Sequence, residues 1–124
     1  MLDKKNFYID GKWTSPIEPR NFKVIDPSNE EICAEISLGG KKDIDKAVTA
    51  AKKAFETWAF TKKEERIELL EKLYVIYKKR WAEMAKLITL EMGAPMKFST
   101  EMQAATGASH IKSFKNILKD FKFE

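Results

Sequence analysis

Cys33 and His110 have the side chains that most often carry nucleophilic or metal chemistry, and each is the only residue of its type. A cysteine becomes a nucleophile when a neighbouring base or positive charge lowers its pKa, and histidine is the usual base. A single cysteine excludes an internal disulfide and a cysteine-based zinc site, and a single histidine argues against a multi-histidine metal site. We interpret Cys33 as a small apolar filler on a strand. His110 has no second catalytic group that can be placed beside it, and we interpret it as a structural or surface residue.

The composition is that of an ordinary globular protein. Of 124 residues, 44% are hydrophobic and 34% are charged, and the formal net charge is +4. This balance excludes a disordered chain, and no apolar run approaches the roughly 20 residues that cross a bilayer. The first residues lead into no apolar signal-peptide core, so we expect a cytoplasmic protein without membrane contact. Most cations are Lys residues interleaved with Glu, as on a solvated helix face, so we expect no nucleic-acid partner.

The first 40 residues have the two-residue period of β-strands. Asp10-Gly11 lies between the apolar residues of 7–9 and 12–13, and it predicts a hairpin because a type I′ turn needs positive φ at both central residues. A second pair of strands is predicted over residues 22–25 and 32–38, with a Pro- and Asn-containing turn between them.

Beyond residue 40 the apolar residues recur at helical spacing. A first helix is predicted over residues 40–58, with an acidic residue in its first turn. A second, long helix is predicted over residues 62–92. A capping box of Thr61 and Glu64 would open it, and Gly93 would close it as a left-handed cap.

A third helix is predicted over residues 95–121, and the small residues of its first half let a neighbouring backbone approach closely. They are Ala104, Ala105, Gly107 and Ala108. The helix over 62–92 would be roughly 46 Å long, which exceeds an isolated globule of this size with a radius of gyration of about 14 Å. The apolar face of this helix is also wider than two short neighbouring elements would cover. We infer that the chain evolved against further protein, either its own continuation or a partner.

Several strings occur in a fixed order along the chain. They are the hairpin at 7–13, the strand and Asp-Pro turn at 24–32, the helix start at 43–48, Arg66 with Leu70, and the Leu-Glu-x-Gly-x-Pro helix end at 87–95. Together they resemble the N-terminal segment of the NAD(P)-dependent aldehyde dehydrogenase superfamily, whose enzymes are several times longer. The resemblance covers nearly all of this chain.

The resemblance implies a partial α/β fold of the aldehyde dehydrogenase type, with N-terminal β-hairpins followed by three helices, the second one long. We therefore predict a β-hairpin region over residues 1–40 and a three-helix region over residues 41–124. Together they would form the first part of an NAD(P)-binding domain and not a complete domain.

The resemblance also implies the activity of the full enzymes, which oxidise aldehydes to carboxylic acids with NAD or NADP as the hydride acceptor. The family's catalytic cysteine, glutamate and asparagine and its cofactor-holding residues lie downstream of the matched segment. No residue here is therefore assigned a catalytic or cofactor-binding role, and Cys33 is not the nucleophile. We expect a structural role for this chain, which alone would be inactive and bind no cofactor. Its expected partners are the remainder of such a chain and further copies in a homo-oligomer of the full enzyme.

One ligand set is implied by the resemblance. In many family members an acid at the position of Glu91 helps to bind a monovalent cation, together with backbone carbonyls that here belong to Val24 and Ile25. Hard cations favour oxygen ligands, and an acid near a helix C-terminus is electrostatically unfavourable without compensation. We therefore predict a monovalent cation site at these residues, and the alternative is an ordinary surface acid.

A second hypothesis is a stand-alone helical interaction module that derives from such an enzyme and binds a partner through its exposed helix faces. A cooperative, monodisperse species would favour this module, whereas aggregation would favour a truncated segment with uncovered apolar patches. A basic nucleic-acid or membrane-surface binder is a third and weaker hypothesis, which salt-dependent binding would test.

Overall fold

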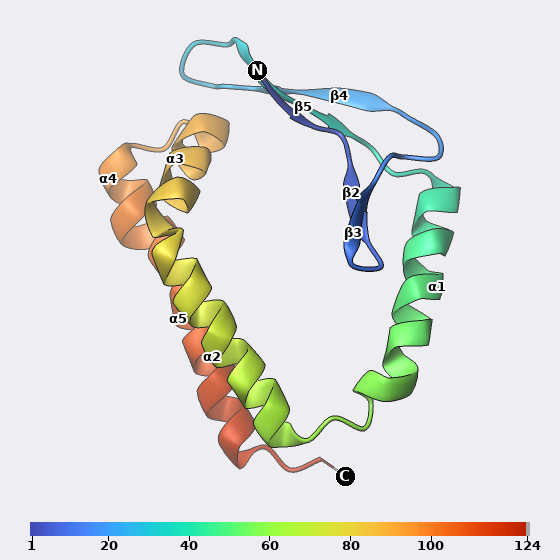
Figure 1. Cartoon of the computed structure of the whole chain (residues 1–124). Helices are drawn as coiled ribbons and strands as arrows, with labels where there is room; N and C mark the ends of the chain where they lie inside the picture. The colour runs from blue at the N-terminus through green and yellow to red at the C-terminus, as the bar shows by residue number, and fades with distance from the viewer. Residues whose placement is uncertain (124) are drawn as a thin grey trace. The chain divides into compact units, whose positions relative to one another are not determined.

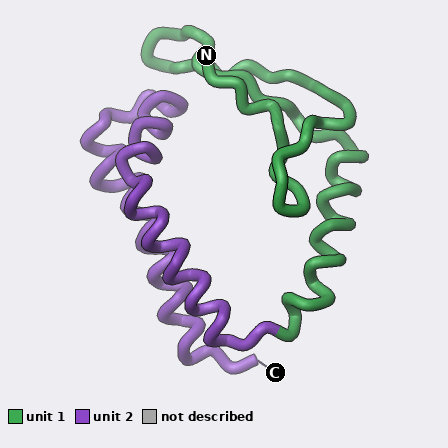
Figure 2. Tube along the Cα trace, in the orientation of Figure 1, with its two compact units in different colours: residues 1–60 green, residues 61–124 purple. Residues whose placement is uncertain are grey.

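The structure is a computed structural model that describes residues 1–123, in which the strands come first and the helices follow (Figure 1). The chain divides into two units, residues 1–60 and residues 61–124 (Figure 2). The order of strands and then helices that the sequence predicts is confirmed. Each unit is considered by itself below.

A two-stranded antiparallel hairpin joins β2 (Phe7–Ile9) to β3 (Lys12–Thr14) in the first unit. The two turn residues, Asp10 and Gly11, have φ angles of 55° and 74°. Positive φ at both positions is what a type I′ turn requires, so the predicted hairpin is confirmed. Tyr8 and Trp13 pair across it with their ring centroids 5.3 Å apart.

A three-stranded sheet with the order β1-β5-β4 forms the rest of the strand region (Figure 1). β4 (Asn21–Ile25) pairs with β5 (Ile32–Ser37) in the antiparallel sense, as the sequence predicts. In the turn between them, the Asp26 carboxylate accepts hydrogen bonds from the backbone amide and the hydroxyl of Ser28. β1 (Leu2–Lys4) pairs in parallel with the other side of β5, and the sequence analysis does not predict this strand.

The helix α1 (Lys41–Trp58) begins at Gly40, as predicted. Asp43 fixes this start because its carboxylate accepts hydrogen bonds from the amides of Gly40 at 3.0 Å and of Ile17 at 2.8 Å. The side chain is 4% exposed, and the Ile17 bond, followed by the Gly40 bond, holds the pKa of Asp43 below its usual range. One acid therefore caps the helix and anchors the preceding loop.

The predicted long helix over residues 62–92 is wrong in one respect, because it is two helices. α2 (Lys63–Lys79) and α3 (Trp81–Met92) meet at Arg80, whose φ and ψ are −100° and 11°. The break coincides with a change of packing partner, because the Trp81 indole N–H donates to the Thr100 carbonyl at 3.0 Å and ties α3 to a different neighbour from that of α2. The C-terminal cap is as predicted, since Gly93 has a φ of 66°.

The predicted capping box at the start of α2 is wrong by one residue. The N-cap is Lys62, whose amide donates to the Glu65 carboxylate at 3.2 Å. The Thr61 hydroxyl instead accepts a hydrogen bond from Nε of Arg66 at 2.8 Å. A side chain one turn ahead therefore competes successfully for the hydroxyl that a Thr cap would use.

The last helical run comprises α4 (Met96–Phe98), the π-helical turn η1 (Ser99–Gln103) and α5 (Ala104–Asp120). It matches the predicted helix over 95–121, with the π turn as the addition. α5 packs on α2 through its small residues. Ala104 and Ala108 are buried, and a Cβ on Gly107 would lie 2.5 Å from the Tyr77 hydroxyl oxygen, so the predicted close approach is confirmed.

Candidate functional site

Cys33 lies on β5, is half-buried and forms no disulfide. Its thiol donates a weak hydrogen bond to the Val24 carbonyl across the strand pair at 3.4 Å. This partner is a neutral carbonyl, and not the base or cation that would favour a thiolate. The arrangement agrees with a packing role for Cys33.

His110 is exposed on α5, as expected of a surface residue. Within residues 1–123, no group of three or more His, Cys, Asp or Glu side chains is placed to hold a metal ion. None of the helices in that part of the chain is long and apolar enough to cross a membrane.

The three predicted cation ligands are divided between the units. Val24 and Ile25 end β4 in the first unit, where the pairing register with β5 shifts between them. Glu91 is exposed near the end of α3 in the second unit. The Val24 carbonyl accepts the hydrogen bond from the Cys33 thiol, and the grouping of Val24, Ile25 and Glu91 at one cation stays a prediction.

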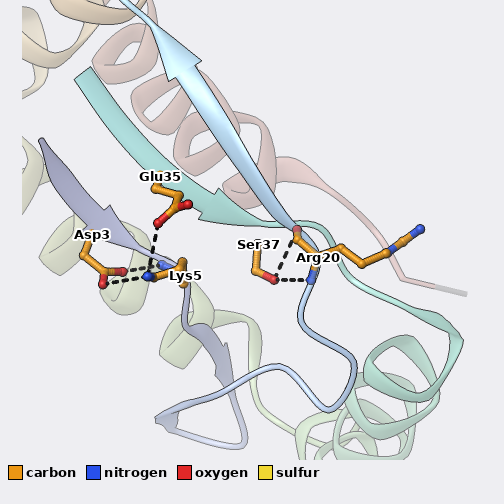
Figure 3. Close-up of polar contacts among 5 residues, drawn as sticks. All are labelled: Asp3, Lys5, Arg20, Glu35 and Ser37. Carbon is orange, nitrogen blue, oxygen red and sulfur yellow. Dashed lines mark hydrogen bonds and ion pairs between the residues drawn. The ribbon is translucent and has the colours of Figure 1, made fainter. Parts of the chain in front are cut away.

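A charged cluster that the sequence analysis does not predict joins β1 to β5 (Figure 3). The Lys5 ammonium lies 3.2 Å from a carboxylate oxygen of Asp3 and 3.2 Å from one of Glu35. The hydrogen bonds to Glu35 and then to Asp3 raise the pKa of Lys5, and those from Lys5 lower the pKa of Asp3. Because Asp3 stays ionised, it is a poor general acid at neutral pH, and the cluster is structural.

A second polar cluster closes the end of the same sheet (Figure 3). The Arg20 amide donates to the Ser37 hydroxyl at 3.3 Å, and the Arg20 guanidinium donates to the Gly39 carbonyl at 2.6 Å. The Leu38 amide donates a hydrogen bond to the Arg20 carbonyl at 2.8 Å. These bonds hold the loop before β4 against the end of β5.

The second unit has one fully buried hydroxyl, Ser99, at the π turn. The Thr89 hydroxyl donates to Ser99 Oγ at 2.9 Å, and Ser99 Oγ donates to the Gln103 side-chain oxygen at 3.3 Å. π turns often occur at functional sites. Here the hydroxyl has both a donor and an acceptor within the unit, so the cluster stabilises the α3–η1 contact.

The most extensive surface feature is uncovered apolar side chains. Large apolar residues stay exposed on α1, α2, α3 and α5, and Phe60, the last residue of the first unit, is 85% exposed. The buried apolar residues are few and mostly small: Ile9, Ala34, Ala85, Ala104 and Ala108. Exposed apolar side chains in this number within each unit are typical of surfaces that pack against further protein.

Comparison with known proteins shows which family this chain is similar to. The model of the "Aldehyde dehydrogenase family" matches residues 13–123. A 3-succinoylsemialdehyde-pyridine dehydrogenase of Pseudomonas sp is 42% identical over 125 residues, covering 100% of this chain and 26% of that relative. The chain thus spans about a quarter of the length of the curated relatives that it matches.

Solved structures agree in fold and in extent. An aldehyde dehydrogenase from Bartonella henselae has a TM-score of 0.97 and 52% identity, covering 99% of this chain and 26% of its own. A mutant of aldehyde dehydrogenase C from Pseudomonas syringae, complexed with NAD+ and octanal, has a TM-score of 0.93 and 34% identity. The match covers 96% of this chain and 24% of that chain.

Proposed function

This chain belongs to the aldehyde dehydrogenase family, and on that premise we propose that it is a structural segment of an NAD(P)-dependent enzyme that oxidises aldehydes to carboxylic acids. The observation that carries the proposal is a family match over residues 13–123 in a chain that spans about a quarter of its relatives. The chain matches the N-terminal part of these enzymes.

The proposed role of the segment is to support the cofactor-binding domain and not to react. The Cys33 thiol donates to a neutral carbonyl, which does not favour the thiolate of a nucleophile, and His110 is an exposed residue of α5. We therefore propose that residues 1–40 and 41–124 form the first part of an NAD(P)-binding domain and that the chain alone has no activity and binds no cofactor. NAD+ in the Pseudomonas syringae complex supports NAD(P) use by the whole enzyme. We also propose that this enzyme is a cytoplasmic homo-oligomer.

The test is a chimera in which this chain replaces the matching quarter of the Bartonella henselae enzyme. Aldehyde-dependent reduction of NAD+ or NADP+ by the chimera, with none by this chain alone, is the expected result. A chimera that folds and assembles like the parent but reduces neither cofactor would contradict the proposed role.

The cation site of Val24, Ile25 and Glu91 is proposed for the whole enzyme. The backbone carbonyls of Val24 and Ile25, at the register shift in β4, and the exposed Glu91 carboxylate near the end of α3 are oxygen ligands of the kind that monovalent cations favour. Glu91→Ala in the chimera should weaken the potassium dependence of activity, and Glu101→Ala, an exposed acid on the same unit, should not. Equal potassium dependence in both variants would remove Glu91 from the set.

A second candidate function is a stand-alone interaction module, which the exposed apolar residues of the helices favour. Sedimentation and cooperative unfolding of the 124-residue chain distinguish the two candidates. A monodisperse chain with a sharp unfolding transition would favour the module, and self-association through uncovered apolar surface would favour the structural segment.

A further inference from the structure

The end of α5 lies beside the start of α2 within the second unit. The hydroxyl of Tyr77, near the end of α2, donates to the Ala104 carbonyl at the start of α5. The ammonium of Lys63, the first residue of α2, donates to the Lys119 carbonyl in the last turn of α5 at 2.7 Å. The two helices are therefore antiparallel neighbours (Figure 1).

The end of α5 takes its cap from α2. The C-cap residue Phe121 has φ and ψ angles of −67° and 128°, and not the left-handed conformation of a glycine cap. The last carbonyls of a helix need hydrogen-bond donors and carry partial negative charge. The Lys63 ammonium supplies both a donor and a positive charge at the Lys119 carbonyl. A side chain 56 residues earlier in the chain thus closes this helix.

Arg66, one turn after Lys63, joins the residue before α2 to the residues after α5. Its Nε donates to the Thr61 hydroxyl at 2.8 Å, and its Cζ lies 5.4 Å from the centroid of the Phe123 ring. A guanidinium over an aromatic face at this distance is attracted to the ring. Phe123 in turn contacts Phe121 edge to face, with the ring centroids 5.0 Å apart. Both Lys63 and Arg66 are half-buried in these contacts.

We propose that Lys63 and Arg66 form a clamp that fixes the path of the chain as it leaves α5. Lys63 closes the end of the helix, and Arg66 holds the Phe123 ring close to Thr61, where the second unit begins. The inference rests on the proposed function, in which the chain after α5 leads into the rest of the enzyme. The two cations are positioning residues, because they act on the direction of the chain and not on a substrate.

Limited trypsin digestion of the full-length chimera with the Bartonella henselae enzyme tests the clamp at its own position. Trypsin needs a locally extended and released chain, so cleavage after Lys119 and Lys122 reports release of the end of α5. The exposed Lys112, in the middle of α5, reports opening of the whole helix. Cleavage rates follow the population of the opened form when opening is fast. Mass spectrometry of the fragments separates the three sites.

Arg66→Met and Lys63→Met keep an unbranched side chain but remove its cation. Each should speed cleavage at the two sites at the end of α5 by about fivefold, which is the effect expected from loss of one such contact. Cleavage at the mid-helix site should not change. Lys63→Arg keeps the charge and the donor and should restore protection. Arg80→Met is the matched control and should change none of the three rates, because the Arg80 guanidinium binds the nearby Glu83 carboxylate.

Each outcome supports the clamp or counts against it. Faster cleavage at the end of α5 alone, in both methionine variants, supports it. Rates equal to those of the unsubstituted chimera overturn it while the proposed function stands. Faster cleavage at all three sites also overturns it, because the two cations would then stabilise the whole helix and not the path of the chain. A folded chimera without activity refutes the proposed function instead, and the cleavage rates of that folded protein still decide on the clamp.

Discussion

Gly107→Ala is predicted to destabilise the second unit, although a glycine-to-alanine change at an exposed helical position would stabilise that helix. Alanine is favoured over glycine by about 1 kcal/mol in a helix interior. The new Cβ, however, would lie 2.5 Å from the Tyr77 hydroxyl oxygen and 2.9 Å from its Cζ. Tyr77 cannot yield freely, because its hydroxyl donates to the Ala104 carbonyl at 2.9 Å and its ring contacts Trp81 edge to face.

The expected magnitude follows from these contacts. Overpacking of a tight interface costs about 1–3 kcal/mol, and loss of the Tyr77–Ala104 hydrogen bond adds about 1 kcal/mol. After the gain in helix propensity, the free energy of unfolding should fall by about 2 kcal/mol. The shift of the urea unfolding midpoint of the full-length chimera with the Bartonella henselae enzyme, followed by circular dichroism, measures the change.

The double variant with Tyr77→Phe is the control for the mechanism. Removal of the hydroxyl eliminates the atom nearest to the new Cβ, so Gly107→Ala should cost less in that background, with a coupling energy of at least about 1 kcal/mol. A Gly107→Ala chain as stable as the parent, or equal costs in both backgrounds, would refute the close-packing argument.

Three further predictions concern local contacts. Amide hydrogen bonds lower the folded-state pKa of Asp43, so its contribution to stability is present above the unfolded-state pKa and is lost as the pH falls below about 4. The melting temperature should therefore fall less on acidification in Asp43→Asn than in the parent. An equal fall in both proteins would contradict this role of Asp43. Gly11→Ala places a Cβ at a φ of 74° and should lower the unfolding free energy by about 1 kcal/mol in urea; an unchanged midpoint would argue against the type I′ turn. Ser99→Ala leaves the Thr89 and Gln103 side chains without their shared hydroxyl and should cost about 1–2 kcal/mol in the same assay, whereas Ser109→Ala, at an exposed helical site, should be neutral.

Elements specified by neighbouring residues are predictable from this sequence. Asp10-Gly11 sets its turn through positive φ, and Gly93 ends α3 in the same way. The start of α1 follows from Asp43, which is three residues beyond the Gly40 amide that it binds. In each case the cause and the structure lie within one turn of chain.

Elements that depend on distant residues are not predictable in this way. The break at Arg80 accompanies a bond from Trp81 to a carbonyl that is 19 residues away. β1 has only three residues and exists by pairing in parallel with β5, and the Lys5 cluster joins residues 30 positions apart. The N-cap of α2 moves from Thr61 because the Arg66 guanidinium takes its hydroxyl.

The candidate site residues also divide into those that neighbouring residues specify and those that depend on distant parts of the chain. The sequence indicates that Cys33 is a packing residue, and the bond from its thiol to the Val24 carbonyl agrees. The cation ligands fall on both units, so local pattern cannot bring Glu91 to Val24 and Ile25. The surplus of apolar helix surface is visible in the sequence because it depends on spacing alone, and the exposed large apolar residues of α2 and α3 are its structural form.

The most direct test of the central claim is aldehyde-dependent NADH formation by the chimera, compared with the same Bartonella henselae enzyme in which a flexible linker replaces the matching quarter. Activity in the chimera and none in the linker version is the predicted result, because this chain supplies the support that the rest of the fold requires. Equal activity in both would show that the segment is dispensable, and a folded chimera without activity would show that this chain cannot serve as that segment.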